Sequence, residues 1–137
     1  MQMRASAIFV AAMLVALPAS AASVLNEPPA APYKKVSTVV KFPDFAPGLG
    51  TLYVDPTTLP EGPFLAYDHE GHLVSTIYMV PLKDMDAQKN FADLASPGGE
   101  VDHISLNYNA GHPGVEEPHY HIVLWHVPKS AEVTVAK

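Results

Sequence analysis

The chain has 137 residues, with 14 acidic and 8 basic side chains, a formal net charge of −6 and no cysteine. An acidic balance with scattered lysines argues against nucleic-acid binding, because phosphate backbones are bound mainly by clustered Lys and Arg. The lack of cysteine excludes disulfides, thiolate metal sites and cysteine nucleophiles.

The N-terminus has the pattern of a secretory signal peptide at residues 1–21. Arg4 provides a positive charge, residues 7–17 form a short apolar run, and Ala19-Ser20-Ala21 supplies small residues for cleavage. The apolar run is shorter than a bilayer-spanning helix requires, and no later stretch comes closer. We therefore expect a secreted or periplasmic protein with no integral membrane segment once the leader is removed.

The rest of the chain is predicted to contain one folded domain. Residues 22–35 are rich in proline and are predicted to be a flexible lead-in. Residues 36–137 have the length of a single domain and show neither an internal repeat nor a second linker. We expect this single domain to be β-rich.

Short runs of Val, Ile, Leu, Tyr and Thr alternate with Pro, Gly and Asp clusters, which predicts antiparallel strands. The predicted strands are residues 36–42, 50–54, 64–67, 73–80, 101–108 and 119–127. Residues 84–95 contain no β-branched side chain and predict one short helix, with Asp84 as its cap. The expected fold class is α+β, mainly β: a small antiparallel sheet or open barrel-like domain with one short helix.

Five of the seven histidines lie between residues 103 and 126. His119 and His121 are two residues apart on a predicted strand, so their imidazoles lean toward the same face and can converge on one ion. The preceding segment, residues 110–118, contains Gly and Pro residues that could hold His112 over the sheet as a third ligand. The spacing thus predicts a metal site built on His112, His119 and His121.

Other side chains could complete this site. If the two flanking strands pair, His103 and Asn107 can face His119 and His121, so His103 is a candidate fourth ligand. Glu117 could supply a carboxylate instead. His126 points away by strand parity and would join only through a bulge.

Zinc suits three imidazoles best, and copper is an alternative in an exported protein that contains Met79 and Met85. The competing interpretation is a non-enzymatic ligand-binding or assembly module, in which the histidines line a polar groove and exposed strands join subunits of a homo-oligomer. The partner would then be a small ligand or a second subunit. No Gly-x-Ser-x-Gly motif is present, so the sequence assigns no catalytic residue.

Residues 48–62, 79–82 and 103–125, taken together, resemble a family of small exported bacterial proteins classed as a domain of unknown function, and the resemblance covers most of the chain after the leader. The signature of that family is an Asn-x-x-Gly-His turn followed by Pro-His-Phe-Asp-x-His-Phe-Tyr. Asn109-Ala110-Gly111-His112, a turn one residue shorter, and Pro118-His119-Tyr120 look like the matching residues. The Asp of the family falls on His121 and its second His on Val123. The resemblance implies a β-rich exported domain and supplies no established activity.

Overall fold

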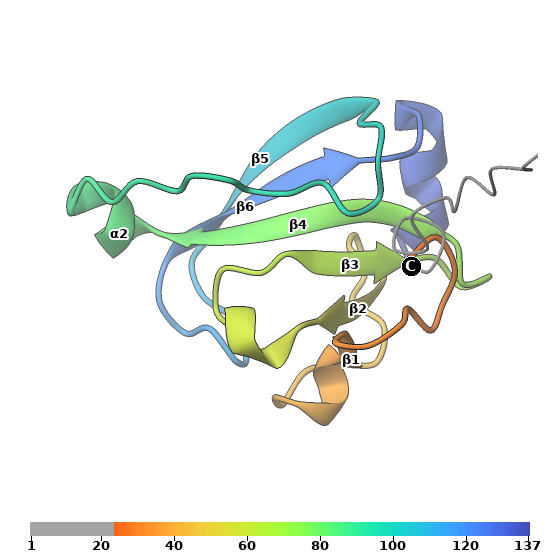
Figure 1. Cartoon of the computed structure of the whole chain (residues 1–137), viewed down its shortest axis with the longest axis horizontal. Coiled ribbons are helices and arrows are strands. Elements are labelled where there is room, and N and C mark those ends of the chain that lie inside the picture. Colours follow the sequence, from red (N-terminus) through yellow and green to blue (C-terminus); the bar gives the residue numbers. More distant parts are fainter. Residues whose placement is uncertain (1–23) are drawn as a thin grey trace, which may run out of the picture.

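Six antiparallel strands form one open sheet in the order β1-β2-β3-β4-β6-β5 (Figure 1). The structure is a computed structural model and describes residues 24–137. The strands are β1 (Lys34–Lys35), β2 (Thr51–Val54), β3 (Phe64–Tyr67), β4 (Leu73–Pro81), β5 (His103–Asn109) and β6 (His119–Trp125). The helical elements are η1 (Val36–Thr38), η2 (Pro56–Thr58), α2 (Leu82–Asp86) and η3 (Lys129–Val135). The predicted small β-rich α+β domain is confirmed.

The main core lies on one face of this sheet, which we call the inner face. Phe64 pairs with Ile77, and Ile77 pairs with Val123, so these three buried side chains line up across β3, β4 and β6. Val36 of η1 and Val135 of η3 pack into the same cluster. Burial of such side chains is the main stabilising contribution to a domain that has no disulfide.

The strand predicted for residues 36–42 is wrong. The amide groups of Val39 and Val40 donate to the carbonyl oxygen of Val36, at 2.9 and 3.0 Å, which curls this segment into η1. Val36, Val39 and Val40 follow the i, i+3, i+4 spacing of a helical face, and all three line one cavity on the inner face. Their β-branched side chains favoured a strand, but packing onto the sheet decided the local structure.

The helix predicted for residues 84–95 is shorter than expected, since α2 ends at Asp86. Pro81 occupies its N-cap and Asp84 lies in its first turn, so Asp84 is not the cap. Gln88 has a φ of 57°, in the left-handed region, and this conformation ends the helix. Residues 87–100 instead cross the outer face of the sheet (Figure 1). The hydroxyl of Tyr78 donates to the carbonyl of Ala95 in this segment.

The lead-in packs against the sheet over the part that is described. Val24 is buried, and its carbonyl oxygen accepts a 2.7 Å hydrogen bond from the hydroxyl of Tyr67. The Tyr53 hydroxyl donates to Glu27 at 2.9 Å. This packing differs from the flexible tether predicted for residues 22–35. The predicted signal peptide, residues 1–21, lies outside the described residues.

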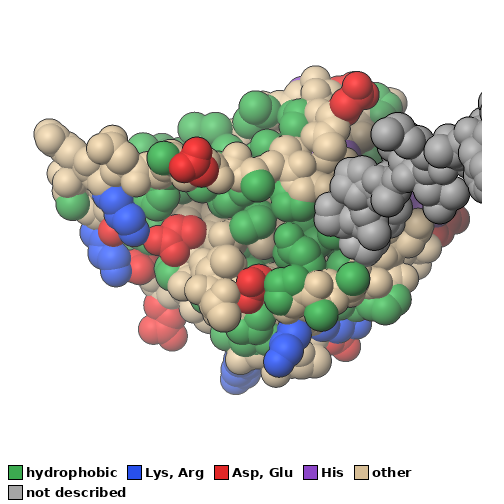
Figure 2. Space-filling model, viewed as in Figure 1, with side chains coloured by type: hydrophobic (Ala, Val, Ile, Leu, Met, Phe, Trp, Pro, Cys, Tyr) green, Lys and Arg blue, Asp and Glu red, His purple; other side chains and the backbone are tan. Residues whose placement is uncertain are grey.

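The outer face of β5 is apolar and exposed. Ile104, Leu106 and Tyr108 are 59%, 61% and 57% exposed, and hydrophobic side chains are visible at this edge of the molecule (Figure 2). Each of them pairs with an apolar residue of β6. Within residues 24–137, no helix combines the length and the apolar character needed to cross a membrane.

Candidate metal centre

Three histidines meet at the inner face, near the end of the sheet where β6 begins. His119 and His121 lie on one face of β6 and are 0% and 6% exposed. His112 reaches them from the loop between β5 and β6. The Nε2 atom of His119 lies 3.2 Å from Nε2 of His112 and 3.0 Å from Nε2 of His121. The predicted convergence of these three side chains is therefore present in the structure.

The loop that carries His112 is held by backbone geometry. Asn109 accepts a hydrogen bond from the Gly111 amide at 2.9 Å, and the backbones of His112 and Val115 bond to each other in both directions. Gly111 has a φ of +130°, and a Cβ at this position would lie 2.4 Å from the carbonyl oxygen of Glu116. Glycine is required here both for the backbone conformation and for the close approach.

Backbone carbonyls fix the tautomers of two of the three rings. Nδ1 of His119 lies 2.7 Å from the carbonyl oxygen of Glu117, and Nδ1 of His112 lies 3.0 Å from that of Pro113. A carbonyl oxygen can only accept, so each Nδ1 carries the proton and donates. In the neutral rings of His112 and His119, the lone pair is therefore on Nε2, which faces the centre of the cluster.

The cluster disfavours a proton. Burial, together with the neighbouring His119 and His112 rings, lowers the pKa of His121 to about 4. No carboxylate belongs to this group of converging ligand atoms among residues 24–137. The group of three imidazoles therefore contains no negative charge that would stabilise a protonated His121.

The spacing of the nitrogens matches a tetrahedral metal ion. Zn–N bonds of about 2.0–2.1 Å at tetrahedral angles place neighbouring nitrogens about 3.3 Å apart. The two Nε2 separations from His119 are 3.2 and 3.0 Å. An ion could therefore sit between the rings with little adjustment of the side chains.

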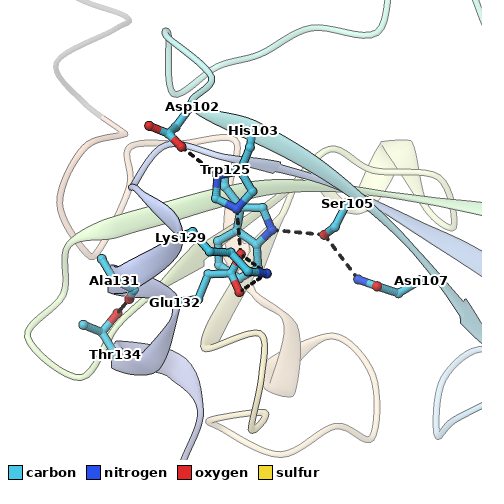
Figure 3. A network of polar contacts seen from close by, with 9 residues as sticks. All are labelled: Asp102, His103, Ser105, Asn107, Trp125, Lys129, Ala131, Glu132 and Thr134. Atoms are coloured by element: carbon cyan, nitrogen blue, oxygen red, sulfur yellow. Dashed lines mark hydrogen bonds and ion pairs between the residues drawn. The ribbon is translucent and has the colours of Figure 1, made fainter.

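The structure does not bring His103 into this group. His103 pairs with Trp125 in the β5–β6 ladder and stacks on its ring (Figure 3). Its Nδ1 donates to Asp102 at 2.8 Å and its Nε2 to Glu132 at 2.6 Å. Glu132, followed by Asp102, raises the pKa of His103 above its ordinary value. Both ring nitrogens are engaged, so His103 is not positioned as the predicted fourth ligand.

The remaining predicted residues also lie outside the cluster. Glu117 directs its carboxylate to Lys83, at 2.8 Å, and contributes to the site through its carbonyl oxygen. Asn107 pairs with His121 as expected, yet its amide donates to Ser105 at 3.4 Å. His126 bonds to Thr76 and to the carbonyl of Glu100, in agreement with the parity that points it away.

A cavity of about 90 Å³ adjoins the cluster. His112 and His121 form part of its wall, and the rest is apolar, with contributions from η1, β2, β3 and β4. His112 also lines a polar surface groove beside Lys41 and Glu116. The sequence analysis missed this cavity, although the helical spacing of Val36, Val39 and Val40 was a signal that the segment packs inward.

A family model described as "TTHB210-like: Hypothetical protein TTHB210" matches residues 68–108. The crystal structure of hypothetical protein TTHB210 from Thermus thermophilus is 48% identical, with a TM-score of 0.62, and the match covers 69% of this chain and 92% of that chain. The chain belongs to the TTHB210-like family. No curated protein matches it.

The TTHB210-like family is described by a hypothetical protein, so membership gives a relationship and a fold but no activity. The predicted relationship to a family of unknown function is confirmed to this extent. The family-model match ends at residue 108 and so does not include His112, His119 or His121. The exported character and the short motifs stay predictions.

Proposed function

We propose that the protein binds one divalent transition metal ion through Nε2 of His112, His119 and His121. One observation carries this proposal: the Nε2 atoms of His112 and His121 lie 3.2 and 3.0 Å from that of His119, while carbonyl oxygens hold the protons of two of the rings on Nδ1. Such an outer hydrogen bond on the far ring nitrogen is the usual support of a metal-bound histidine.

The alternative of three imidazoles bonded to each other fits this geometry less well. A hydrogen bond between two nitrogens requires a proton between them. His112 and His119 both direct a lone pair at the other across 3.2 Å, and two lone pairs at this distance repel. A cation at the centre removes this repulsion, because it accepts the lone pairs of His112 and His119 and can also accept one from Nε2 of His121.

Zinc is the metal that we propose first, because three imidazoles with one open position are a common zinc ligand set. Copper is the alternative. Met79 lines the cavity beside His121, whereas Met85 is 51% exposed and lies away from it. A thioether contribution to copper would therefore come from Met79 and not from Met85.

We also propose that the mature protein acts outside the cytoplasm, as a secreted or periplasmic protein. The support for this proposal is the leader pattern at residues 1–21. Imidazole ligands do not depend on a reducing compartment, so a metal site built from histidine is compatible with export.

The test is elemental analysis of untagged protein purified without chelators, beside a His119→Ala/His121→Ala double variant. We expect close to one zinc or copper per chain in the wild type and none in the double variant. His103→Ala is the matched control, since it removes another histidine from the same pair of strands and should keep the metal. Absence of metal from the wild type, even after incubation with zinc, would overturn the proposal.

An assembly module is the second candidate, and the exposed apolar side chains of Ile104, Leu106 and Tyr108 favour it. They lie on β5, an edge strand, and edge strands with apolar faces are natural contact surfaces between subunits. Light scattering before and after chelation separates the candidates. A module that works by assembly keeps its oligomeric mass without metal, and Leu106→Lys should lower that mass. A monomeric mass in all samples would exclude this candidate.

A further inference from the structure

The wall of the cavity beside the histidine cluster is almost entirely apolar. Except for His112 and His121, the side chains of its wall are apolar. The apolar wall includes Val40, Phe42, Leu52, Val54, Phe64 and Met79. The two imidazoles are therefore the only side chains of this wall that could hydrogen-bond to a ligand or bind a metal ion.

We infer that this cavity holds the short apolar chain of a small molecule whose anionic head group, a carboxylate, binds the metal ion. The inference rests on the proposed metal site and names the class of ligand that the site would take: short-chain aliphatic carboxylates. The cavity reaches two of the three metal-binding side chains, so a molecule inside it lies next to the metal position.

The size of the cavity sets the kind of chain. An apolar cavity of about 150 Å³ is enough for a benzene molecule, and this one has a volume of about 90 Å³. An unbranched chain of a few carbons fits such a space better than a ring. Val36 and Val40 would shield the aliphatic chain of the ligand from water on one side, and the side chains of the inner face would shield it on the other.

The charge of the site sets the kind of head group. Three neutral imidazoles leave the full charge of a divalent ion uncompensated, and the wall of the cavity contains no carboxylate among the described residues. An anion at the open coordination position offsets that charge in a place of low polarity. Because His112 also lines the polar groove beside Lys41, the head group can be reached from solvent on that side.

The experiment uses protein loaded with Co²⁺, whose visible absorption reports on ligands at the open position. Titration with acetate, butyrate, hexanoate and octanoate gives a dissociation constant for each acid. We expect the affinity to rise about fourfold for each added methylene, until the cavity is filled, after which the gain stops. Metal-free protein, titrated in a calorimeter because it lacks the absorption of Co²⁺, should show no binding of acetate.

Two variants with opposite effects on the cavity keep this test informative if one of them folds poorly. Val40→Phe reduces the space and should stop the gain at a shorter chain, whereas Val40→Ala enlarges it and should extend the gain to a longer chain. Val133→Phe is the matched control, because the same increase in side-chain size occurs where residue 133 is 71% exposed. The control should behave like the wild type.

The outcomes separate this inference from the metal site. If Co²⁺ does not bind, the proposed function fails and the inference fails with it. If Co²⁺ binds but acetate and octanoate bind equally well, the metal site stands and the ligand class is wrong. An increase with chain length that is the same in both Val40 variants would place the chain outside the cavity and would also overturn the inference.

Discussion

His103 and the triad of His112, His119 and His121 lie on β5, β6 and the loop between these strands. Their surroundings nevertheless differ in charge. His103 has a carboxylate on each ring nitrogen, Asp102 and Glu132 (Figure 3). The triad has carbonyl oxygens on the outer nitrogens of two rings and other imidazoles on the inner ones. A proton on His103 satisfies the first arrangement, whereas in our proposal a bound metal ion would satisfy the second.

This difference shows that neighbours, and not the residue type, decide what a histidine does. Carboxylates raise the pKa of His103, and the resulting ion pairs fasten η3 to the sheet through Glu132. Burial, together with the neighbouring imidazoles, lowers the pKa of His121 to about 4, so at neutral pH this ring is uncharged and one of its two nitrogens keeps a lone pair for a metal ion. The two sites should therefore respond differently to mutation, to pH and to metal.

The largest effect expected is on metal affinity. His119→Ala removes the central ligand, from which the other two Nε2 atoms are 3.2 and 3.0 Å away, and should weaken zinc binding at least 100-fold in competition with a chromophoric chelator. His103→Ala should change zinc affinity less than twofold. Equal losses in the two variants would remove the distinction between the sites.

The second effect concerns the stability of the metal-free protein in acid. His121 has a pKa lowered to about 4 in the folded state, whereas the unfolded chain binds a proton near pH 6.5. Stability should fall as the pH drops from 6.5 to 4, by up to about 3 kcal/mol. Urea denaturation in the presence of a chelator measures it. His121→Asn should flatten this part of the pH profile, and an unchanged slope in that variant would contradict the assignment.

The third effect tests the loop that positions His112. Gly111→Ala places a methyl group against the carbonyl of Glu116 and forces an alanine to a φ of +130°. Strain of about 1–3 kcal/mol should shift the loop and lower zinc affinity about tenfold. Gly48→Ala is the control, because Gly48 also has a positive φ but its added Cβ meets nothing within 4 Å. A Gly48 variant that loses as much zinc affinity would refute a specific role for the loop.

The smallest effect has the opposite dependence on pH. Because the folded pKa of His103 is raised, its contribution is complete below about pH 6.5 and is lost as the pH rises through that higher value. The stability difference between the wild type and His103→Gln should shrink from pH 6 to pH 9 in metal-free protein. The change should be small because these side chains are partly exposed. A difference that grows with pH would show that the ion pair does not form.

Most of the strands could be predicted from the sequence, because β3, β4 and β6 are mainly apolar, β5 alternates polar and apolar residues, and turn residues lie between these strands. Residues 36–42 have a similar composition, but residues 36–38 form η1, and Val36, Val39 and Val40 line the same cavity on the inner face. The early end of α2 depended on the left-handed conformation of Gln88. A glutamine in the sequence does not predict this conformation.

The triad could be predicted because a period of two along a strand puts His119 and His121 on one face and because Gly111 marks the turn that carries His112. His103 could not be separated from the triad in the same way. His103 lies on the same face of the sheet as His119 and His121, but the strand register pairs it with Trp125. The carboxylate that it contacts belongs to Glu132, which is 29 residues later in the chain. Strand register and the docking of η3 are tertiary features that no local pattern contains.

Anomalous diffraction from crystals of the zinc-loaded protein, measured on both sides of the zinc absorption edge, tests the central claim most directly. We predict one strong peak about 2.0–2.1 Å from each Nε2 of His112, His119 and His121. A peak at the group of Asp68, Glu70 and His72 instead, or no peak among the three histidines, would contradict the account.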